Sequence, residues 1–489
     1  MPNKISRIKN FLSANHTVKQ TILKNTFWLS SSEIVGRLFK AAVVIYAARV
    51  LGAAGFGTFS YVMGLASLLT AFSDLGMSSI VVREGAKNPQ LRARYFSTAL
   101  GLTSLLALAS ALIIIFGAPL ITKIPISHVL VIIVALVFVF DIIRGLVGSA
   151  IFRAQEKMEG EALVTIVTQL VIVGAGFYLL TRFRSPEGFA LAYAVGSATG
   201  LLLALYLVRD YIRQFIARFE KALIKPILNA SIPMSLATIL GVVMINTDIV
   251  LLGWLTDAAN VGLFAAAQRP ITLLYAIPSL IAAGIFPALA RFAEKDQSRF
   301  RLLNEKSIVA VLLFAFPLAV GFLLTGKEIV HLLYGSQYLP ATLTMQILAI
   351  TLITMFPMSM LNNGIFAYNK QKFLVKVGVV GVTVNALLDI ILIPILGIVG
   401  CAIATVGTQV VTSAFIWFKM KRINNFSVIG NLKKIIIATL LMGLAVAGLI
   451  QIGLHILLII ILATIIYFGT LILLKEKLFS DLKSILASS

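Results

Sequence analysis

The chain has 489 residues, of which 59% are apolar and 12% are charged, with a net charge of +22 and a mean hydropathy of +1.00. A water-soluble chain carries about 25% charged residues, and a single soluble core stops growing beyond about 250–300 residues. The composition therefore excludes a soluble enzyme, and it makes the positive charge a feature of a membrane protein rather than of a nucleic-acid-binding protein.

Apolar runs recur along the whole chain. Each is about 20 residues long, the length that an α-helix needs to cross the hydrocarbon core of a bilayer. Helices also satisfy their own backbone hydrogen bonds in lipid. The sequence therefore predicts an all-α integral membrane protein with about 14 transmembrane helices. The expected spans are 27–50, 57–82, 95–117, 127–149, 161–181, 188–208, 229–254, 261–289, 306–325, 341–361, 373–396, 398–418, 435–453 and 456–474.

The basic residues are distributed unequally between the expected connections. When the connections are assigned alternately to the two sides of the membrane, 32 of the 41 lysines and arginines fall on the side of the N-terminus. Only Lys123, Arg182, Arg184 and Lys327 fall on the opposite side. Because positively charged connections stay in the cytoplasm, we expect a multi-pass protein of the cell (cytoplasmic) membrane with both termini cytoplasmic.

Two short motifs recur at similar intervals along the chain. Residues 53–59 follow the first span and resemble residues 258–264, which follow the seventh; residues 151–157 and 365–371 follow spans four and ten. Since six spans restore the orientation, the repeats predict two six-helix lobes related by an axis along the membrane normal, plus two C-terminal helices. The expected domains are a cytoplasmic segment 1–24, an N-lobe 25–220, a C-lobe 221–425, and the last two helices with a cytoplasmic tail, 426–489.

Charged residues inside the spans are the strongest functional signal. The acids are Glu33, Asp74, Asp141, Asp248 and Asp389, and the cations are Arg37, Lys40, Arg49, Arg144 and Arg269. A charge at the centre of the bilayer costs about 2.5–3.5 kcal/mol on insertion scales, whereas a Leu, Ile, Phe or Val returns only about 0.3–0.6 kcal/mol. Three of these charges lie close together in the first span, so that face of the span is not expected to contact lipid.

Four polar residues of the first span lie on one helical face, because they are spaced by three, four and three residues: Ser30, Glu33, Arg37 and Lys40. One interpretation is a polar wall of a water-filled cavity that binds substrate. The alternative is a buried ion pair between Glu33 and Arg37 that fixes the packing. The equivalent positions of the second lobe are uncharged: Thr238, Val242 and Ile245. Since the lobes share a shape but not this charge, substrate binding is the favoured interpretation.

Charged and polar residues of later spans extend the candidate site. Asp141 and Arg144 are three residues apart, and we expect a local ion pair there rather than a substrate contact. In the second lobe, Asp248 and Arg269, together with Asn246, are candidates to complete the substrate cavity that begins with Ser30 and its neighbours on the first span. The open alternative is that Asp248 and Arg269 have only structural roles.

Two further acids inside spans have no obvious partner in the sequence. Asp74 and Asp389 are either carboxylates that couple transport to an ion, H⁺ or Na⁺, or acids that are packed for structural reasons. An intramembrane acid is costly in either case. We therefore keep both residues as candidate ion-coupling sites, with the structural alternative open.

Motifs for other chemistry are incomplete. Residues 321–327 match part of a phosphate-binding loop, but Glu328 replaces the residue that would hold magnesium, and the segment ends an apolar span. The four histidines are scattered, and the single cysteine, Cys401, lies in an apolar run. We therefore expect no nucleotide, no cofactor, no metal site, no catalytic residues and no nucleic-acid partner.

Several segments, spread over nearly the whole chain, form a set of motifs: residues 48–59, Asp74-Leu-Gly76, Arg83-Glu84, residues 261–269, Ile277-Pro278, Phe286-Pro287, Tyr334-Gly335, Tyr338, Asn385 and residues 394–397. This set resembles Wzx-type oligosaccharide (polysaccharide) flippases of the multidrug/oligosaccharidyl-lipid/polysaccharide exporter superfamily. The resemblance implies a non-enzymatic transporter that moves polyprenyl-diphosphate-linked oligosaccharides from the cytoplasmic to the external leaflet by alternating access.

The expected partners follow from this resemblance. They are a lipid-linked oligosaccharide, membrane lipids and a coupling ion, and the cations Arg37, Lys40 and Arg269 would bind the diphosphate. The alternatives are a lipid II-type precursor flippase and a multidrug or cation antiporter of the same superfamily. A membrane enzyme is disfavoured, because the longest expected external connection, Gly326 to Pro340, is too short to form a catalytic domain.

Overall fold

The computed structural model describes residues 18–88, 90–155, 157–210, 219–428, 430 and 432–476. Within these residues all regular secondary structure is helical. Twelve helical segments are long and apolar enough to cross a membrane by length and composition. Helix α2 (Val18–Asp74) is not among these twelve segments, and the non-helical Gly52 divides it into two parts. The expected all-α membrane architecture is therefore confirmed.

The described residues divide into two compact units, Met1–Asn246 and Thr247–Ser489, called here the N-terminal unit and the C-terminal unit. The division falls inside helix α10 (Ile224–Leu255). It lies further along the chain than residue 220, where the sequence repeat places the end of the first lobe. The predicted boundary comes from the sequence repeat, whereas the observed division reflects how compactly the helices pack. The end of the repeat therefore stays a prediction.

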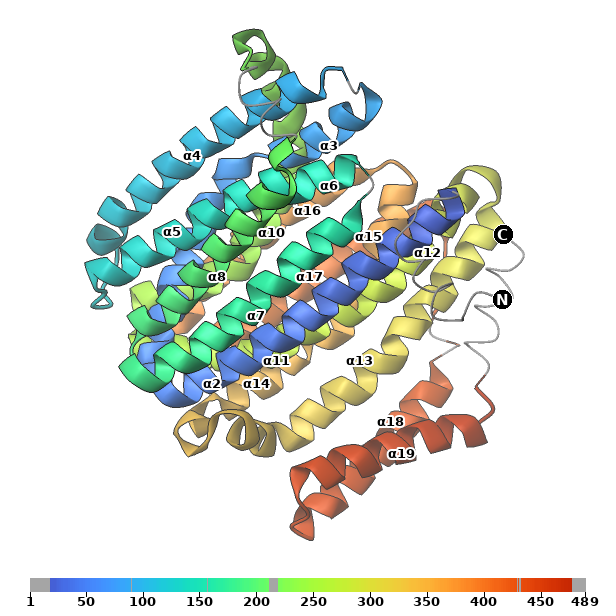
Figure 1. Ribbon diagram of the computed structural model, residues 1–489. Helices are drawn as coiled ribbons and strands as arrows, with labels where there is room; N and C mark the ends of the chain where they lie inside the picture. Colours follow the sequence, from blue (N-terminus) through green and yellow to red (C-terminus); the bar gives the residue numbers. More distant parts are fainter. Residues whose placement is uncertain are drawn as a thin grey trace, which may run out of the picture. The chain divides into compact units, whose positions relative to one another are not determined.

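The N-terminal unit is built around α2 and the helices that follow it in the chain. They are α3 (Met77–Lys87), α4 (Arg92–Ile121), α5 (His128–Arg144), the π-helix η1 (Gly145–Ala150), α6 (Ile151–Ala154), α7 (Met158–Phe183), α8 (Pro186–Leu207) and the short η2 (Lys221–Leu223). Helix α7 packs against both α2 and α8, and α5 packs against α4 and α8 (Figure 1). Helix α2 is therefore one member of a packed group of helices.

Helices α7 and α8 approach closely because α8 carries glycines four residues apart. A Cβ atom added to Gly196 would collide with Ile172, and one added to Gly200 would collide with the Thr168 hydroxyl. Small residues at this spacing let two membrane helices bring their backbones together. The α7–α8 pair is therefore a close-packed contact within the N-terminal unit.

The second expected span, 57–82, ends earlier than predicted. Helix α2 stops at Asp74, Leu75 and Gly76 adopt left-handed backbone conformations with φ of 43° and 74°, and α3 begins at Met77. A Cβ atom on Gly76 would lie 3.1 Å from the carbonyl oxygen of Ser231 on α10. Glycine adopts this conformation without a steric penalty, so the chain turns a corner that hydropathy alone does not reveal.

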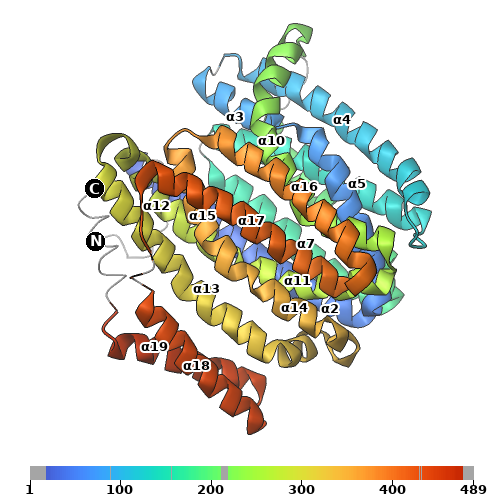
Figure 2. The ribbon, with the colours of Figure 1, turned by 180° about the vertical axis from the view of Figure 1, so that it is seen from behind.

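The C-terminal unit contains the end of α10, residues 247–255, and ten further elements within its described residues. They are α11 (Ala258–Leu274), α12 (Ala276–Lys295), α13 (Gln297–Tyr334), η3 (Ser336–Ala341), α14 (Thr342–Ala349), α15 (Thr351–Ala367), α16 (Gln371–Leu396), α17 (Ile398–Asn424), α18 (Lys433–Gln451) and α19 (Ile456–Leu473). Helix α15 packs against α12, α13 and α17, and α16 packs against α17 (Figure 2). The expected span 261–289 is divided at Tyr275 into α11 and α12.

The last two helices are fastened to α13 by a specific hydrogen bond. Pro317 lies inside α13 and lacks an N–H, so the carbonyl of Leu313, four residues earlier, loses its helical donor. The Tyr467 hydroxyl of α19 donates to this carbonyl at 2.6 Å. In a membrane an unsatisfied carbonyl is costly, so this bond explains why a polar tyrosine tip is buried in an apolar hairpin.

Candidate functional sites

Glu33 and Arg37 form an ion pair on α2. The Arg37 guanidinium donates to Glu33 Oε1 at 2.8 and 2.9 Å, as the spacing of four residues allows. The side chains of Glu33 and Arg37 are 60% and 40% exposed, so this is not the buried ion pair of the structural alternative. Charged groups inside a span avoid lipid, and their exposure therefore indicates a surface that water reaches.

Lys40 lies one turn further along α2. Its Nζ is 5.8 Å from the centre of the Tyr193 ring on α8, a geometry that permits a cation–π interaction. The side chain of Ser30, the remaining member of the predicted stripe, lies outside the described part of the chain. Glu33 and Arg37 are thus brought together, while Lys40 is directed toward Tyr193.

The ion pairs of the N-terminal unit that the sequence did not reveal include two that involve α7. Lys24 of α2 pairs with Glu159 of α7 at 3.2 Å and is 1% exposed. Arg153 of α6 makes two hydrogen bonds, of 2.8 and 2.6 Å, to the Glu161 carboxylate of α7. Each pair joins two helices, so no local spacing could have predicted it.

The expected local pair on α5 is confirmed. Arg144 Nη2 donates to Asp141 Oδ1 at 2.9 Å, and Arg144 Nη1 lies 3.4 Å from the Thr168 hydroxyl of α7. This pair, like Glu33–Arg37, obeys the three- or four-residue spacing of a helix surface. The charged groups of this unit that lie within its expected spans are therefore largely balanced by neighbours of opposite sign.

Arg269 in the C-terminal unit is different. It lies on α11 immediately before Pro270, and among the described residues no carboxylate forms an ion pair with it. Its Nε is buried without a hydrogen-bond partner there, as is the hydroxyl of Tyr334 on α13. The two groups are close enough to interact electrostatically. Both groups therefore lack a hydrogen-bond acceptor within the described residues.

A second cluster in the C-terminal unit is acidic. The carboxylates of Asp248 on α10 and Asp389 on α16 and the thiol of Cys401 on α17 are buried, and their ligand atoms lie within 4.8 Å of one another. The Thr405 hydroxyl lies 2.8 Å from Asp248 Oδ2 and 3.0 Å from the carbonyl oxygen of Cys401. Asn385, one turn before Asp389, adds an amide oxygen that has no partner within the described ranges.

The acidic cluster lacks a balancing charge. In the part of the chain that the structure describes, no lysine or arginine pairs with Asp248 or Asp389, and one oxygen of Asp248 and both oxygens of Asp389 have no hydrogen-bond partner. Burying an unpaired charge is strongly unfavourable, and the described part of the chain supplies no counter-charge to the two acids. The donors are mainly hard oxygens, which suit a cation such as Na⁺ rather than a soft transition metal.

Sequence reasoning singled out the two acids but did not place them together. Asn385 and Asp389 are four residues apart on one helix, as are Cys401 and Thr405 on the next. That spacing puts each pair on a single face of its helix. It was the only local feature of these residues that pointed to a polar cluster. Which faces meet depends on packing, which the spacing does not contain.

The remaining predicted residues lie in the N-terminal unit. The Asn246 amide donates to the Val242 carbonyl at 2.8 Å and lies 3.4 Å from the Ser67 hydroxyl. Asp74, at the corner after α2, accepts hydrogen bonds from the backbone and hydroxyl of Ser78 at 3.2 and 2.6 Å. Asn246 is thus occupied largely by its own helix, whereas Asp74 keeps one carboxylate oxygen available.

The helices cross the membrane and carry charged residues within their expected spans, some of them exposed and some in buried clusters. These features are typical of one class of protein, the all-helical membrane transporters. The profile of the family described as "Polysaccharide biosynthesis protein" matches residues 22–293, more than half of the chain. The chain belongs to this family, which confirms the resemblance seen in the sequence.

Individual relatives are distant. "Probable low-salt glycan biosynthesis flippase Agl15" of Haloferax volcanii is 22% identical over 386 residues, which cover 78% of this chain and 80% of that protein. The solved structure "Lipid II flippase MurJ, inward closed conformation" matches with a TM-score of 0.76 at 17% identity, over 94% of this chain and 100% of that one. A multidrug resistance MATE family transporter of the MOP superfamily matches with a TM-score of 0.65 at 16% identity, over 80% and 96% of the two chains. These structures share the fold.

Proposed function

We propose that the protein is a flippase that moves a polyprenyl-diphosphate-linked oligosaccharide from the cytoplasmic to the external leaflet, for assembly of a surface polysaccharide or glycan. Its family and the name of its Haloferax volcanii relative support a transporter of glycan precursors rather than an enzyme. The observation that carries the proposal is the pair of unmatched donors, Arg269 and Tyr334, in the C-terminal unit.

The diphosphate is the part of such a substrate that these donors fit. A guanidinium presents a planar fork that matches phosphate oxygens, and charge-assisted hydrogen bonds of this kind are among the strongest in proteins. The Tyr334 hydroxyl adds a neutral donor. An anion that arrives at Arg269 therefore satisfies groups that are otherwise buried without partners among the described residues.

The α2 stripe supplies further headgroup contacts in this proposal. Arg37 and Lys40 carry the positive charge, Glu33 orients Arg37 through their ion pair, and Ser30 and Asn246 serve the sugar hydroxyls. The exposure of the Glu33–Arg37 pair supports a polar, water-accessible surface. Alternating access, with both termini in the cytoplasm, is the transport mode that the charge distribution and the fold neighbours favour.

The acidic cluster is proposed as the site of the coupling cation, H⁺ or Na⁺. Asp248 and Asp389 need one positive charge between them, and the oxygens of Asn385 and Thr405 complete a set of hard donors. A cation that enters from the external side, where it is abundant, would supply the free energy for transport. This assigns Asp248 to the ion rather than to the sugar.

Reconstitution of the full chain tests the flippase proposal. Liposomes containing polyprenyl-diphosphate-linked oligosaccharide extracted from the source membranes are treated with an impermeant reagent that oxidises sugars. The protein should increase the oxidised fraction beyond that in protein-free liposomes. Arg269→Ala should slow this increase about 10–100-fold, because a hydrogen bond to a charged group contributes about 1.5–3 kcal/mol.

The matched control is Arg291→Ala, which removes an exposed arginine of α12 that lies over the Phe292 ring. It should leave the rate unchanged. Equal rates for Arg269→Ala and the wild type would contradict the assignment of the diphosphate site. No increase over protein-free liposomes would contradict the flippase proposal itself.

A lipid II-type precursor is the second candidate substrate, favoured by the match to the solved lipid II flippase over the whole of that chain. It carries the same diphosphate but a peptide-bearing disaccharide. The same liposomes loaded with lipid II distinguish the two. Transport of lipid II at a rate above that of the extracted oligosaccharide would replace the first proposal by the second.

A further inference from the structure

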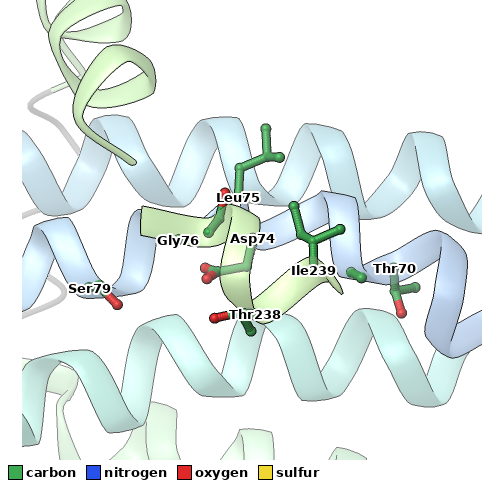
Figure 3. Close-up of a pocket in the computed structure, with 9 residues that line it drawn as sticks. Thr70, Asp74, Leu75, Gly76, Ser79, Thr238 and Ile239 are labelled. Carbon is green, nitrogen blue, oxygen red and sulfur yellow. The ribbon is translucent and has the colours of Figure 1, made fainter. Parts of the chain in front are cut away.

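A pocket of about 240 Å³ lies within the N-terminal unit, beside the corner where α2 turns into α3. Its polar lining comes from three elements: Thr70 and Asp74 of α2, Ser79 of α3, and Ser235 and Thr238 of α10. Figure 3 shows the Asp74 carboxylate and the Thr238 hydroxyl pointing in the same direction. None of these residues takes part in the proposed diphosphate site or in the proposed cation site.

Three of the polar groups have no partner among the described residues. Asp74 Oδ1 accepts from Ser78, which leaves Oδ2 without a hydrogen bond there. The hydroxyls of Ser79 and Thr238 likewise make no hydrogen bond within that part of the chain, whereas Thr70 and Ser235 donate to carbonyls of their own helices. The pocket therefore offers one anionic acceptor and two hydroxyls that both donate and accept.

The corner holds the carboxylate in place. Ser78 fixes one oxygen of Asp74 through both its backbone N–H and its hydroxyl. Gly76 brings the turn against the Ser231 carbonyl and Ser235 of α10, where a Cβ atom would be crowded at 3.1 and 3.2 Å. A preorganised acceptor of this kind loses little freedom when it binds a ligand.

The lining selects between classes of ligand. The single negative charge disfavours phosphate, and five oxygen-bearing residues disfavour an acyl chain. The volume is several times the roughly 30 Å³ share of one water molecule in the liquid, which is more than a bare cation needs. Apolar surface from Ala71 and Ile239 lies beside the polar groups, a combination that suits the C–H faces and hydroxyls of a sugar ring.

We propose that this pocket binds one neutral sugar residue of the substrate, with Asp74 accepting hydrogen bonds from sugar hydroxyls. The inference deepens the proposed function and rests on it. It gives Asp74 a role in recognition instead of ion coupling. By the expected topology the corner lies at the cytoplasmic end of the second span, where the substrate would be loaded.

Thiol protection tests the pocket. Thr238→Cys places a reactive group on an exposed pocket position, while the native Cys401 is buried. The purified full chain is labelled with a maleimide in the presence of either polyprenyl-diphosphate-linked oligosaccharide from the source membranes or polyprenyl diphosphate alone. The glycan-bearing lipid should slow labelling at least about tenfold, and polyprenyl diphosphate should not. Thr181→Cys, exposed at the end of α7, is the control that neither lipid should protect.

The Asp74→Asn substitution tests the role of the carboxylate in the pocket. In the Thr238→Cys background it should weaken protection by the glycan-bearing lipid about tenfold or more, as expected for the loss of a charged hydrogen-bond acceptor, while binding of polyprenyl diphosphate is unchanged. Equal protection by both lipids would overturn the sugar assignment in favour of the lipid path. Protection by Na⁺ alone would overturn it in favour of a cation.

A direct binding titration distinguishes a failure of the flippase proposal from a failure of the sugar pocket. If the wild-type chain binds neither lipid in a direct titration, the flippase proposal fails and the sugar pocket with it. If both lipids bind but the thiol introduced at position 238 reacts at the same rate throughout, only the sugar pocket is wrong.

Discussion

The two units differ in whether their intramembrane charges are paired with charges of opposite sign. In the N-terminal unit several acids pair with neighbouring cations, as in Glu33–Arg37, Asp141–Arg144 and Arg153–Glu161. Asp74 at the end of α2 is the exception among the described acids of that unit's expected spans, and it is held by Ser78. In the C-terminal unit Arg269 has no acidic partner, and Asp248 and Asp389 have no basic one among the described residues.

The contrast separates two uses of charge. A paired charge is already neutralised, so it can stabilise helix packing or present a polar surface without requiring a ligand. An unpaired buried charge remains costly until a ligand of opposite sign arrives. The C-terminal unit is therefore where anion and cation binding should have the largest energetic consequences.

The largest effect is expected when one unpaired acid of the C-terminal unit is neutralised. Asp389→Asn removes a charge that the coupling cation needs, so the dependence of transport on a Na⁺ or H⁺ gradient should be abolished. Glu161→Gln, which removes a paired acid of α7, should keep the gradient dependence. Transport by liposomes with imposed Na⁺ or pH gradients measures both. A gradient response retained in Asp389→Asn would remove the cluster from the coupling mechanism.

A buried pair in the N-terminal unit should respond asymmetrically. Glu159→Gln leaves the buried Lys24 ammonium without its counter-charge and should lower the free energy of unfolding by about 3 kcal/mol. Lys24→Met leaves a carboxylate that is about a third exposed and should cost under about 1 kcal/mol. Thermal unfolding of the purified variants measures the difference. The opposite order would contradict the conclusion that the buried side of this pair depends on its exposed partner.

The exposed pair on α2 should have an intermediate effect on transport. Arg37→Ala should reduce the rate about tenfold, Arg37→Lys should be partly tolerated because it keeps the charge without the fork, and Glu33→Gln should be milder than Arg37→Ala. Surface polysaccharide in a flippase-deficient host, normalised to protein level, is the measurement. Recovery in the Glu33→Gln, Arg37→Ala double variant would show that the pair is structural.

The smallest expected effect concerns the attachment of the last two helices. Tyr467→Phe removes the donor to the Leu313 carbonyl and should destabilise the protein by about 1 kcal/mol. Pro317→Ala restores a backbone donor to that carbonyl, so Tyr467→Phe should cost less in its presence. A double-mutant cycle of unfolding free energies checks this, and additive costs would contradict the link.

Local features of the fold were predictable, and tertiary ones were not. Hydropathy located the spans, and helical spacing predicted the Asp141–Arg144 pair, because both depend on residues close in sequence. The turn at Leu75 was missed, since a leucine gives no signal of a left-handed backbone. The Lys24–Glu159 pair and the meeting of Asp248 with Asp389 depend on which helix faces pack together, and one sequence does not contain that information in its local pattern.

The bond between Tyr467 and the carbonyl freed by Pro317 also has an evolutionary consequence. A proline inside a membrane helix is tolerable only while another group satisfies the carbonyl that it frees, and here that group comes from a residue 154 positions later in the chain. Relatives that lack the last two helices should therefore lack the proline as well. Where the hairpin is kept, the two residues should be inherited or replaced together.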